Sequence, residues 1–236
     1  MEPPARETIA AHVHVVLSKI HRAAEKVGRP ASSVRLVAAT KTVGVDRIRE
    51  GIEAGLSIFG ENRVQEAVPK IAALMQTPVR WHFIGQLQRR KVRLVIGLFD
   101  LIHSVDSLEL AQEIDRRTGD AGRCQDILLE VNIGNEPTKT GLPPDHIMQL
   151  MPAMAALAHI RIKGLMAIPP PTDGTEMARP YFRRLRDVAT RIDEMRLPSV
   201  TMGELSMGMS NDYEVAVEEG ATLVRVGTAI FGARHV

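Results

Sequence analysis

Short apolar runs alternate with segments of helical spacing along almost the entire chain. The runs predict strands, and they lie at residues 34–40, 56–59, 81–84, 101–104, 127–131, 160–166, 204–206 and 223–226. The segments between them predict helices at 45–54, 61–74, 108–117, 144–158, 176–196 and 212–219. Helices of this length are the usual crossovers between parallel strands. Eight strands connected in this way predict a closed parallel (β/α)8 barrel of the TIM type.

An extra helix is predicted at the start of the chain. Its apolar residues fall at helical spacing, and they are Ile9, Val13, Val16, Leu17 and Ile20. The pattern ends near Gly28-Arg29-Pro30, where glycine and proline favour a helix end. Only residues 228–236 follow the last strand, too few for a full outer helix. We therefore expect the N-terminal helix to cover that side of the barrel.

A doubly wound open sheet is the alternative fold. That fold usually has a glycine-rich first turn, whereas the first strand here is followed by Thr40-Lys41-Thr42-Val43-Gly44. The length of 236 residues also suits one barrel, which commonly needs about 250 residues. We expect a single barrel domain over residues 1–236.

Composition and charge argue against several classes of protein. The net charge of +2 is far from the basic excess of a dedicated nucleic-acid binder, and the basic cluster at 89–93 is interpreted as a solvated helix face. Cys124 is the only cysteine, which rules out an intramolecular disulfide and indicates a reducing compartment; we expect it to be buried. The histidines lack metal-ligand spacing, so no metal is predicted. The chain shows neither a secretion signal nor a membrane span, and we expect a cytoplasmic protein.

Lys41 stands at the end of the first predicted strand, and this position indicates a reactive amine. Apolar neighbours on the strand are expected to desolvate it and so favour its neutral, nucleophilic form. Ser206, Gly227 and Thr228 follow the seventh and eighth predicted strands, where barrels often bind phosphate. Small residues and hydroxyls at these turns allow a close backbone approach and supply hydrogen-bond donors. An amine for an aldehyde and donors for a phosphate together predict pyridoxal 5'-phosphate as the ligand.

Arg225 lies inside the last predicted strand, where a permanent charge needs an acceptor. One interpretation is a structural ion pair with Glu204 on the neighbouring strand. The other is a hydrogen bond to the pyridine nitrogen of the cofactor, which would weaken the ring as an electron sink.

Two predicted loops are candidate rims of the site, because both follow strands and are rich in Gly, Pro, Asn and Thr. They span residues 132–144 and 168–174. His82 and Met166 also stand at strand ends, and each either lines the pocket or packs in the core.

Several ordered motifs carry a family resemblance. They are Val37-Ala38-Ala39-Thr40-Lys41-Thr42, Phe59-Gly60-Glu61-Asn62, Gln65-Glu66, Trp81-His82-Phe83-Ile84-Gly85, Gly164-Leu165-Met166, Leu205-Ser206-Met207-Gly208-Met209-Ser210 and Val224-Arg225-Val226-Gly227-Thr228-Ala229-Ile230-Phe231-Gly232. Through them the chain resembles the pyridoxal 5'-phosphate homeostasis proteins, single-domain relatives of the alanine racemase N-terminal barrel. The resemblance spans nearly the whole chain. Arg63 and Gln86 depart from it, standing where an aromatic residue and a proline are expected.

The resemblance assigns a role to each candidate residue. It implies that Lys41 carries pyridoxal 5'-phosphate as a reversible aldimine and that Asn62 lies near the ring hydroxyl. It also implies that Arg225 faces the ring nitrogen. The phosphate would be held by Ser206, Gly227 and Thr228.

The resemblance predicts a cofactor-binding homeostasis protein that delivers the cofactor, with apo pyridoxal-phosphate enzymes as candidate partners, without turnover of a substrate. Racemases with this barrel have a further C-terminal β domain that supplies a catalytic tyrosine, whereas this sequence ends at Val236; a monomer is expected. Tyr213, close to the phosphate loop, leaves a weak racemase or lyase as an alternative. A lysine Schiff-base aldolase acting on a sugar phosphate is the third hypothesis.

Overall fold

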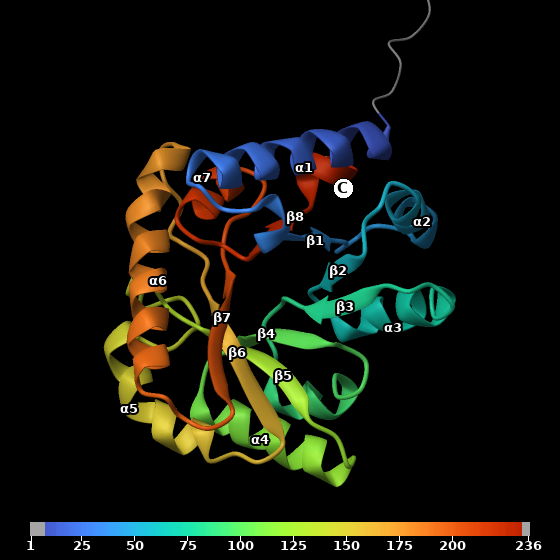
Figure 1. The fold of residues 1–236 in the computed structure, drawn as a ribbon. Helices are drawn as coiled ribbons and strands as arrows, with labels where there is room; N and C mark the ends of the chain where they lie inside the picture. Colours follow the sequence, from blue (N-terminus) through green and yellow to red (C-terminus); the bar gives the residue numbers. More distant parts are fainter. Residues whose placement is uncertain (1–7, 233–236) are drawn as a thin grey trace, which may run out of the picture.

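A computed structural model of the chain describes residues 8–232 and shows a closed barrel of parallel strands (Figure 1). The strands follow one another around the barrel in chain order, from β1 to β8. Their bounds are β1 Arg35–Ala39, β2 Ile58–Glu61, β3 Arg80–Phe83, β4 Leu101–Val105, β5 Gln125–Glu130, β6 Ile160–Met166, β7 Val200–Ser206 and β8 Leu223–Val226. β1 pairs with both β2 and β8, which closes the barrel. The predicted TIM-type fold is confirmed, and the open doubly wound sheet is wrong.

Helices surround the barrel, and most of them lie where the sequence predicts them. The α-helices are α1 Ile9–Lys26, α2 Val45–Glu53, α3 Val64–Ala73, α4 Leu108–Asp120, α5 Pro144–Ala155, α6 Arg179–Glu194, α7 Tyr213–Glu218 and α8 Thr228–Phe231, with 3-10 turns η1 Ala31–Ser33, η2 Arg89–Leu94 and η3 Thr175–Ala178. The helix expected from residue 61 begins only at Val64, because Glu61 is the buried last residue of β2. The basic cluster at 89–93 forms the 3-10 turn η2 instead of an α-helix.

The N-terminal helix α1 covers the barrel beside the short α8, as predicted from the chain lengths. It packs against α2, α7 and α8 (Figure 1). Its buried face consists of Ile9, Val13, Val16, Ile20, Ala23 and Ala24. The helix therefore supplies the apolar cover that the last strand lacks from its own crossover.

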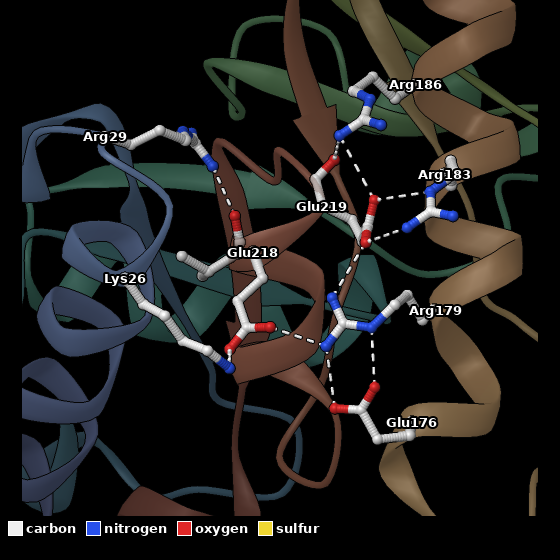
Figure 2. Close-up of polar contacts among 9 residues, drawn as sticks. Lys26, Arg29, Glu176, Arg179, Arg183, Arg186, Glu218 and Glu219 are labelled. Atoms are coloured by element: carbon white, nitrogen blue, oxygen red, sulfur yellow. Dashed lines mark hydrogen bonds and ion pairs between the residues drawn. The ribbon is translucent and has the colours of Figure 1, made fainter.

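Ion pairs and hydrogen bonds of charged side chains connect α1, α6 and α7. Glu219, only 4% exposed, lies after α7 and is surrounded by three guanidinium groups of α6 (Figure 2). They belong to Arg179, Arg183 and Arg186. Glu218 pairs with both Arg179 and Lys26, and the Arg29 guanidinium donates to the Val217 carbonyl at 2.7 Å. Burial raises the pKa of Glu219, but hydrogen bonds from Arg183 and Arg179 outweigh it and lower the pKa below its ordinary value.

The barrel interior holds both an aliphatic cluster and buried polar side chains. The aliphatic cluster consists of Val37, Ile58, Leu101, Leu128, Met166 and Leu223. His82, His103, Ser206 and Arg225 are buried polar side chains on the strands. Inward-pointing residues fill such barrels in layers, so these polar residues interrupt an otherwise apolar column.

Cys124 is exposed, so the expectation that it is buried is wrong. It stands just before β5, where the chain passes from the turn into the barrel. No helix within residues 8–232 is long and apolar enough to cross a membrane.

Candidate functional site

A cavity of about 950 Å³ opens at the carboxyl ends of the strands. We call it the upper cavity. Five of the six predicted site residues line it, and they are Lys41, Asn62, Arg225, Gly227 and Thr228. The proline-rich loop at 168–174 forms part of its wall, as expected, whereas the loop at 132–144 contributes only Lys139. Its volume lies in the range of small-molecule sites.

A buried polar cluster fixes the strand end that carries Lys41. The preceding residue, Thr40, is fully buried, and its Oγ1 donates to Glu61 Oε1 at 2.6 Å. Lys70 on α3 donates from Nζ to the same Glu61 oxygen and to the Thr40 carbonyl, each at 2.7 Å. The backbone beside Lys41 is therefore bonded to both β2 and α3.

Lys41 itself is exposed in the cavity, so the expected desolvation by its strand neighbours is wrong. β1 ends at Ala39, and the chain has already turned at Lys41. The next residue, Thr42, has a φ of +63°, an uncommon conformation for a β-branched residue. Its amide donates to Glu66 Oε2 at 3.2 Å, which holds this turn. Such strained positions cluster at ligand sites, where the surrounding structure fixes them.

Asn62 follows β2, and its side-chain oxygen is buried. No group among residues 8–232 donates a hydrogen bond to Asn62 Oδ1. Gly85 packs directly against the Asn62 backbone, since a Cβ at Gly85 would lie 2.2 Å from the Asn62 carbonyl oxygen. A buried acceptor without a donor is costly, so this oxygen marks a place for a ligand donor.

Ser206 does not line the upper cavity. Its side chain is fully buried inside the barrel, where its Oγ lies 2.8 Å from His103 Nδ1 and accepts from the Arg225 guanidinium. Ser210 lines the cavity instead. The chain turns at Gly208, with a φ of +89°, and this turn carries the second serine of the motif to the rim. The position of Ser210 two residues after Gly208 is the sequence feature that could have identified it as a cavity residue.

Arg225 has no ion pair with Glu204, so that interpretation is wrong. Glu204 instead pairs with Arg35 and accepts from the Thr222 hydroxyl. The Arg225 guanidinium donates to the carbonyl oxygens of Ser206 at 2.7 Å and Ala167 at 3.0 Å. Burial lowers the pKa of Arg225 to about 10, so the side chain keeps its charge at neutral pH. Neutral acceptors thus orient a full positive charge at the base of the cavity.

The remaining sequence candidates lie elsewhere. Met166 belongs to the aliphatic cluster inside the barrel, and His82 is buried against His103. Tyr181 and Tyr213 are the only tyrosines of the chain, and neither lines the upper cavity. Burial raises the pKa of Tyr213 to about 12.

Three further charged groups share the cavity wall with Lys41 and Arg225. Besides Lys139 they are Arg47 of α2 and Asp212, which follows the turn that carries Ser210. Asp212 Oδ1 accepts from the Met209 amide at 2.6 Å, while burial raises the pKa of the Asp212 carboxyl. Within residues 8–232 no group of three His, Cys, Asp or Glu side chains could hold a metal ion.

Comparison with known proteins identifies the family. The family model of the alanine racemase N-terminal domain matches residues 15–235. A pyridoxal phosphate homeostasis protein of Aquifex aeolicus is 46% identical over 219 residues, covering 93% of this chain and 95% of the relative. The chain belongs to the pyridoxal phosphate homeostasis protein family.

Solved structures resemble this family member over nearly its full length. PipY of Synechococcus elongatus, whose structure was solved with PLP bound, is 38% identical with a TM-score of 0.84, covering 95% of this chain and all of that one. An unknown protein from Bifidobacterium adolescentis, whose crystal structure is solved, is 39% identical with a TM-score of 0.90, covering 98% of both chains. The family motifs around Lys41 and Arg225 therefore lie on a barrel that relatives share as a whole.

Proposed function

We propose that this protein binds pyridoxal 5'-phosphate in the upper cavity and serves intracellular homeostasis of that cofactor. The proposal rests on one observation. The exposed amine of Lys41 lies in the same cavity as the hydrogen-bond donors of Ser210, Gly227 and Thr228. An aldehyde and a phosphate on one small molecule match these two features. The names of the relatives and the PLP-bound PipY structure support the same ligand.

The residues of the cavity fit the functional groups of this cofactor. Asn62 Oδ1 lacks a donor among residues 8–232, and the ring hydroxyl of the cofactor would supply one. Arg225 presents a permanent donor at the base of the cavity, suited to the pyridine nitrogen. The start of α8 at Thr228 and the preceding Gly227 offer backbone amides to a phosphate, with the hydroxyls of Ser210 and Thr228 beside them.

Lys41 is the proposed covalent anchor. Its amine would condense with the aldehyde, forming a Schiff base and releasing one water, and the bond is reversible by hydrolysis. The cofactor, when bound, supplies an electron-withdrawing ring. Because Arg225 stays protonated at neutral pH, it would donate a hydrogen bond to the ring nitrogen without transferring a proton. That arrangement limits carbanion chemistry.

We propose that the protein holds and releases the cofactor without turning over a substrate. No tyrosine lines the upper cavity, so the residue type that the racemase alternative needs as acid or base is missing from its wall as described by residues 8–232. The relatives carry the name of homeostasis proteins. We further propose that the whole chain acts as one cytoplasmic, monomeric domain and passes the cofactor to apo enzymes that depend on it.

A loading titration tests this function. Pyridoxal 5'-phosphate is added to the purified protein, and the Schiff-base absorption band is followed for the wild type, Lys41→Ala and Lys139→Ala. Lys139 is the matched control, because it is the other lysine on the wall of the same cavity. We expect the band to be lost in Lys41→Ala and kept in Lys139→Ala.

The same loaded protein is then mixed with amino acids, and racemisation and elimination products are measured. Rates no higher than those of free cofactor support the homeostasis function, whereas faster turnover favours the racemase or lyase alternative. A wild-type protein that does not load at all would contradict both, and would leave the Schiff-base aldolase.

A further inference from the structure

A second cavity, of about 460 Å³, opens at the opposite end of the barrel. We call it the lower cavity. It is formed at the amino ends of the strands, since Arg35, Arg80, Leu101 and Gln125 are the first residues of β1, β3, β4 and β5. Lys41 lies beyond the other end of β1, so the lower cavity is separate from the proposed cofactor site.

Basic side chains from four different segments converge on the lower cavity. They are Arg35, Arg80, Arg123, Arg161 and Lys163. Arg161 and Lys163 come from β6, while Arg123 lies in the turn before β5. The wall also holds three carboxylates, Asp100, Asp126 and Glu204.

All three carboxylates are already engaged. Asp126 pairs with Arg161, and Glu204 pairs with Arg35. Asp100 accepts from the Trp81 backbone amide at 2.8 Å.

Three of the basic side chains have no such partner. Among residues 8–232, the side chains of Arg80, Arg123 and Lys163 take part in no hydrogen bond or ion pair. Two guanidinium groups and one ammonium therefore face a cavity whose acidic groups are occupied. Unpaired cations gathered from separate segments attract an anion, and guanidinium groups match the oxygens of phosphate.

His82 adds a buried imidazole to the wall of this cavity. Its Nδ1 lies 3.0 Å from His103 Nε2, and His103 Nδ1 lies 2.8 Å from Ser206 Oγ, which accepts from Arg225. These contacts tie His82, which lines the lower cavity, to His103, Ser206 and Arg225 across the barrel interior.

His82 carries no charge at neutral pH. Burial, aided by the charges of Arg80 and Arg35, lowers the pKa of His82 to about 3. The imidazole is then neutral over the whole physiological pH range, and the positive charge of the cavity comes from its Arg and Lys side chains.

We propose that the lower cavity is a binding site for a small anion that carries a phosphate group. Arg80, Arg123 and Lys163 supply positive charge and hydrogen-bond donors. These groups offer more donors, from more directions, than one carboxylate can accept, whereas a phosphate dianion carries three acceptor oxygens. The volume leaves room for a small organic group attached to the phosphate.

An NMR titration with inorganic phosphate tests the site, because chemical shifts report each cavity separately. We expect saturable shifts at Gly97 and Asp126 around the lower cavity, and at the imidazole resonances of His82. Shifts at Gly227 and Thr228 report the upper cavity and form an independent data set. Failure of the proposed cofactor function would therefore leave this test intact.

The double variant Arg80→Gln/Arg123→Gln removes the two unpaired guanidinium groups. Both side chains are exposed and unbonded within the described residues, so the variant should fold. We expect phosphate affinity at the lower cavity to fall by about tenfold or more. Arg191→Gln is the matched control, since Arg191 is an exposed arginine of α6 that lines neither cavity; it should leave the affinity within about twofold.

Three results would overturn the proposal. The first is the absence of saturable shifts at the lower cavity in the wild type. The second is shifts that persist unchanged in the double variant. The third is an equal response to acetate at matched ionic strength, which would mean an unselective basic surface.

Discussion

The buried ion pair between Lys70 and Glu61 holds the strand end that precedes Lys41, and its contribution can be measured as a free energy of unfolding. Glu61 is fully buried and Lys70 is 8% exposed, and their Nζ–Oε1 distance is 2.7 Å. Glu61 Oε2 has no hydrogen-bond partner in the described structure, so the carboxylate depends on Lys70 and Thr40. Lys70→Met removes the cation and leaves a buried negative charge.

Breaking a buried ion pair from one side costs about 3–5 kcal/mol. For a domain of this size, about 1 kcal/mol lowers the melting temperature by roughly 2–4 °C, so Lys70→Met should melt about 6–20 °C below the wild type. The double variant Glu61→Leu/Lys70→Met replaces both charges by apolar groups of similar size. It should regain at least about half of the loss, because no charge is left buried.

The assay is urea unfolding followed by circular dichroism, with thermal melts beside it. Asp46→Asn is the control, since Asp46 pairs with Arg49 but its side chain is 93% exposed, and it should change stability by less than about 1 kcal/mol. A loss below about 1 kcal/mol in Lys70→Met, or a double variant no more stable than the single one, would refute the argument.

Three further predictions follow from the site and the barrel interior. Ser210→Ala should weaken cofactor binding about tenfold in a cofactor titration, because a hydrogen bond to the charged phosphate is lost. Ser206→Ala should leave that affinity nearly unchanged and instead lower the stability measured by urea unfolding. Gly85→Ala places a methyl group 2.2 Å from the Asn62 carbonyl oxygen and should cost at least about 1–3 kcal/mol, which a normal melting temperature would contradict. Burial lowers the pKa of His82 to about 3, so unfolded protein binds a proton that folded protein rejects, and stability should fall as pH drops from 6.5 toward 3 by up to about 1.4 kcal/mol per pH unit. His82→Gln should flatten that slope in unfolding experiments at pH 4 to 7, and an unchanged slope would contradict the assignment.

The sequence predicted the barrel well because parallel strands buried on both faces appear as nearly continuous apolar runs. Every predicted run overlaps one of the strands from β1 to β8. The helix boundaries were less reliable where a strand end is polar, as at Glu61, which the helical pattern claimed although it is fully buried in β2.

The site residues were predictable where strand ends alone decide the position. Lys41, Asn62, Gly227 and Thr228 all follow strands and all reach the upper cavity. Ser206 and Ser210 could not be told apart, since the choice depends on the turn at Gly208.

Side-chain partners were the least predictable features of the chain. Glu204 bonds Arg35 rather than Arg225, a choice set by the height of each residue within the barrel: Arg35 lies at the start of β1, whereas Arg225 lies near the end of β8. The hydrogen-bond chain through His82 and His103 joins strands that the sequence gives no reason to pair in this way. Charge and spacing along the chain do not reveal the height of each side chain within the barrel, and that height decides which side chains pair.

Borohydride trapping tests the central claim most directly. The protein is loaded with pyridoxal 5'-phosphate, reduced, digested with trypsin and mapped by mass spectrometry. We predict that the cofactor adduct lies on the peptide of residues 36–47, with cleavage blocked at Lys41, and that no other lysine is labelled to a comparable extent. An adduct on Lys139 or another lysine, with residues 36–47 unmodified, would contradict the claim.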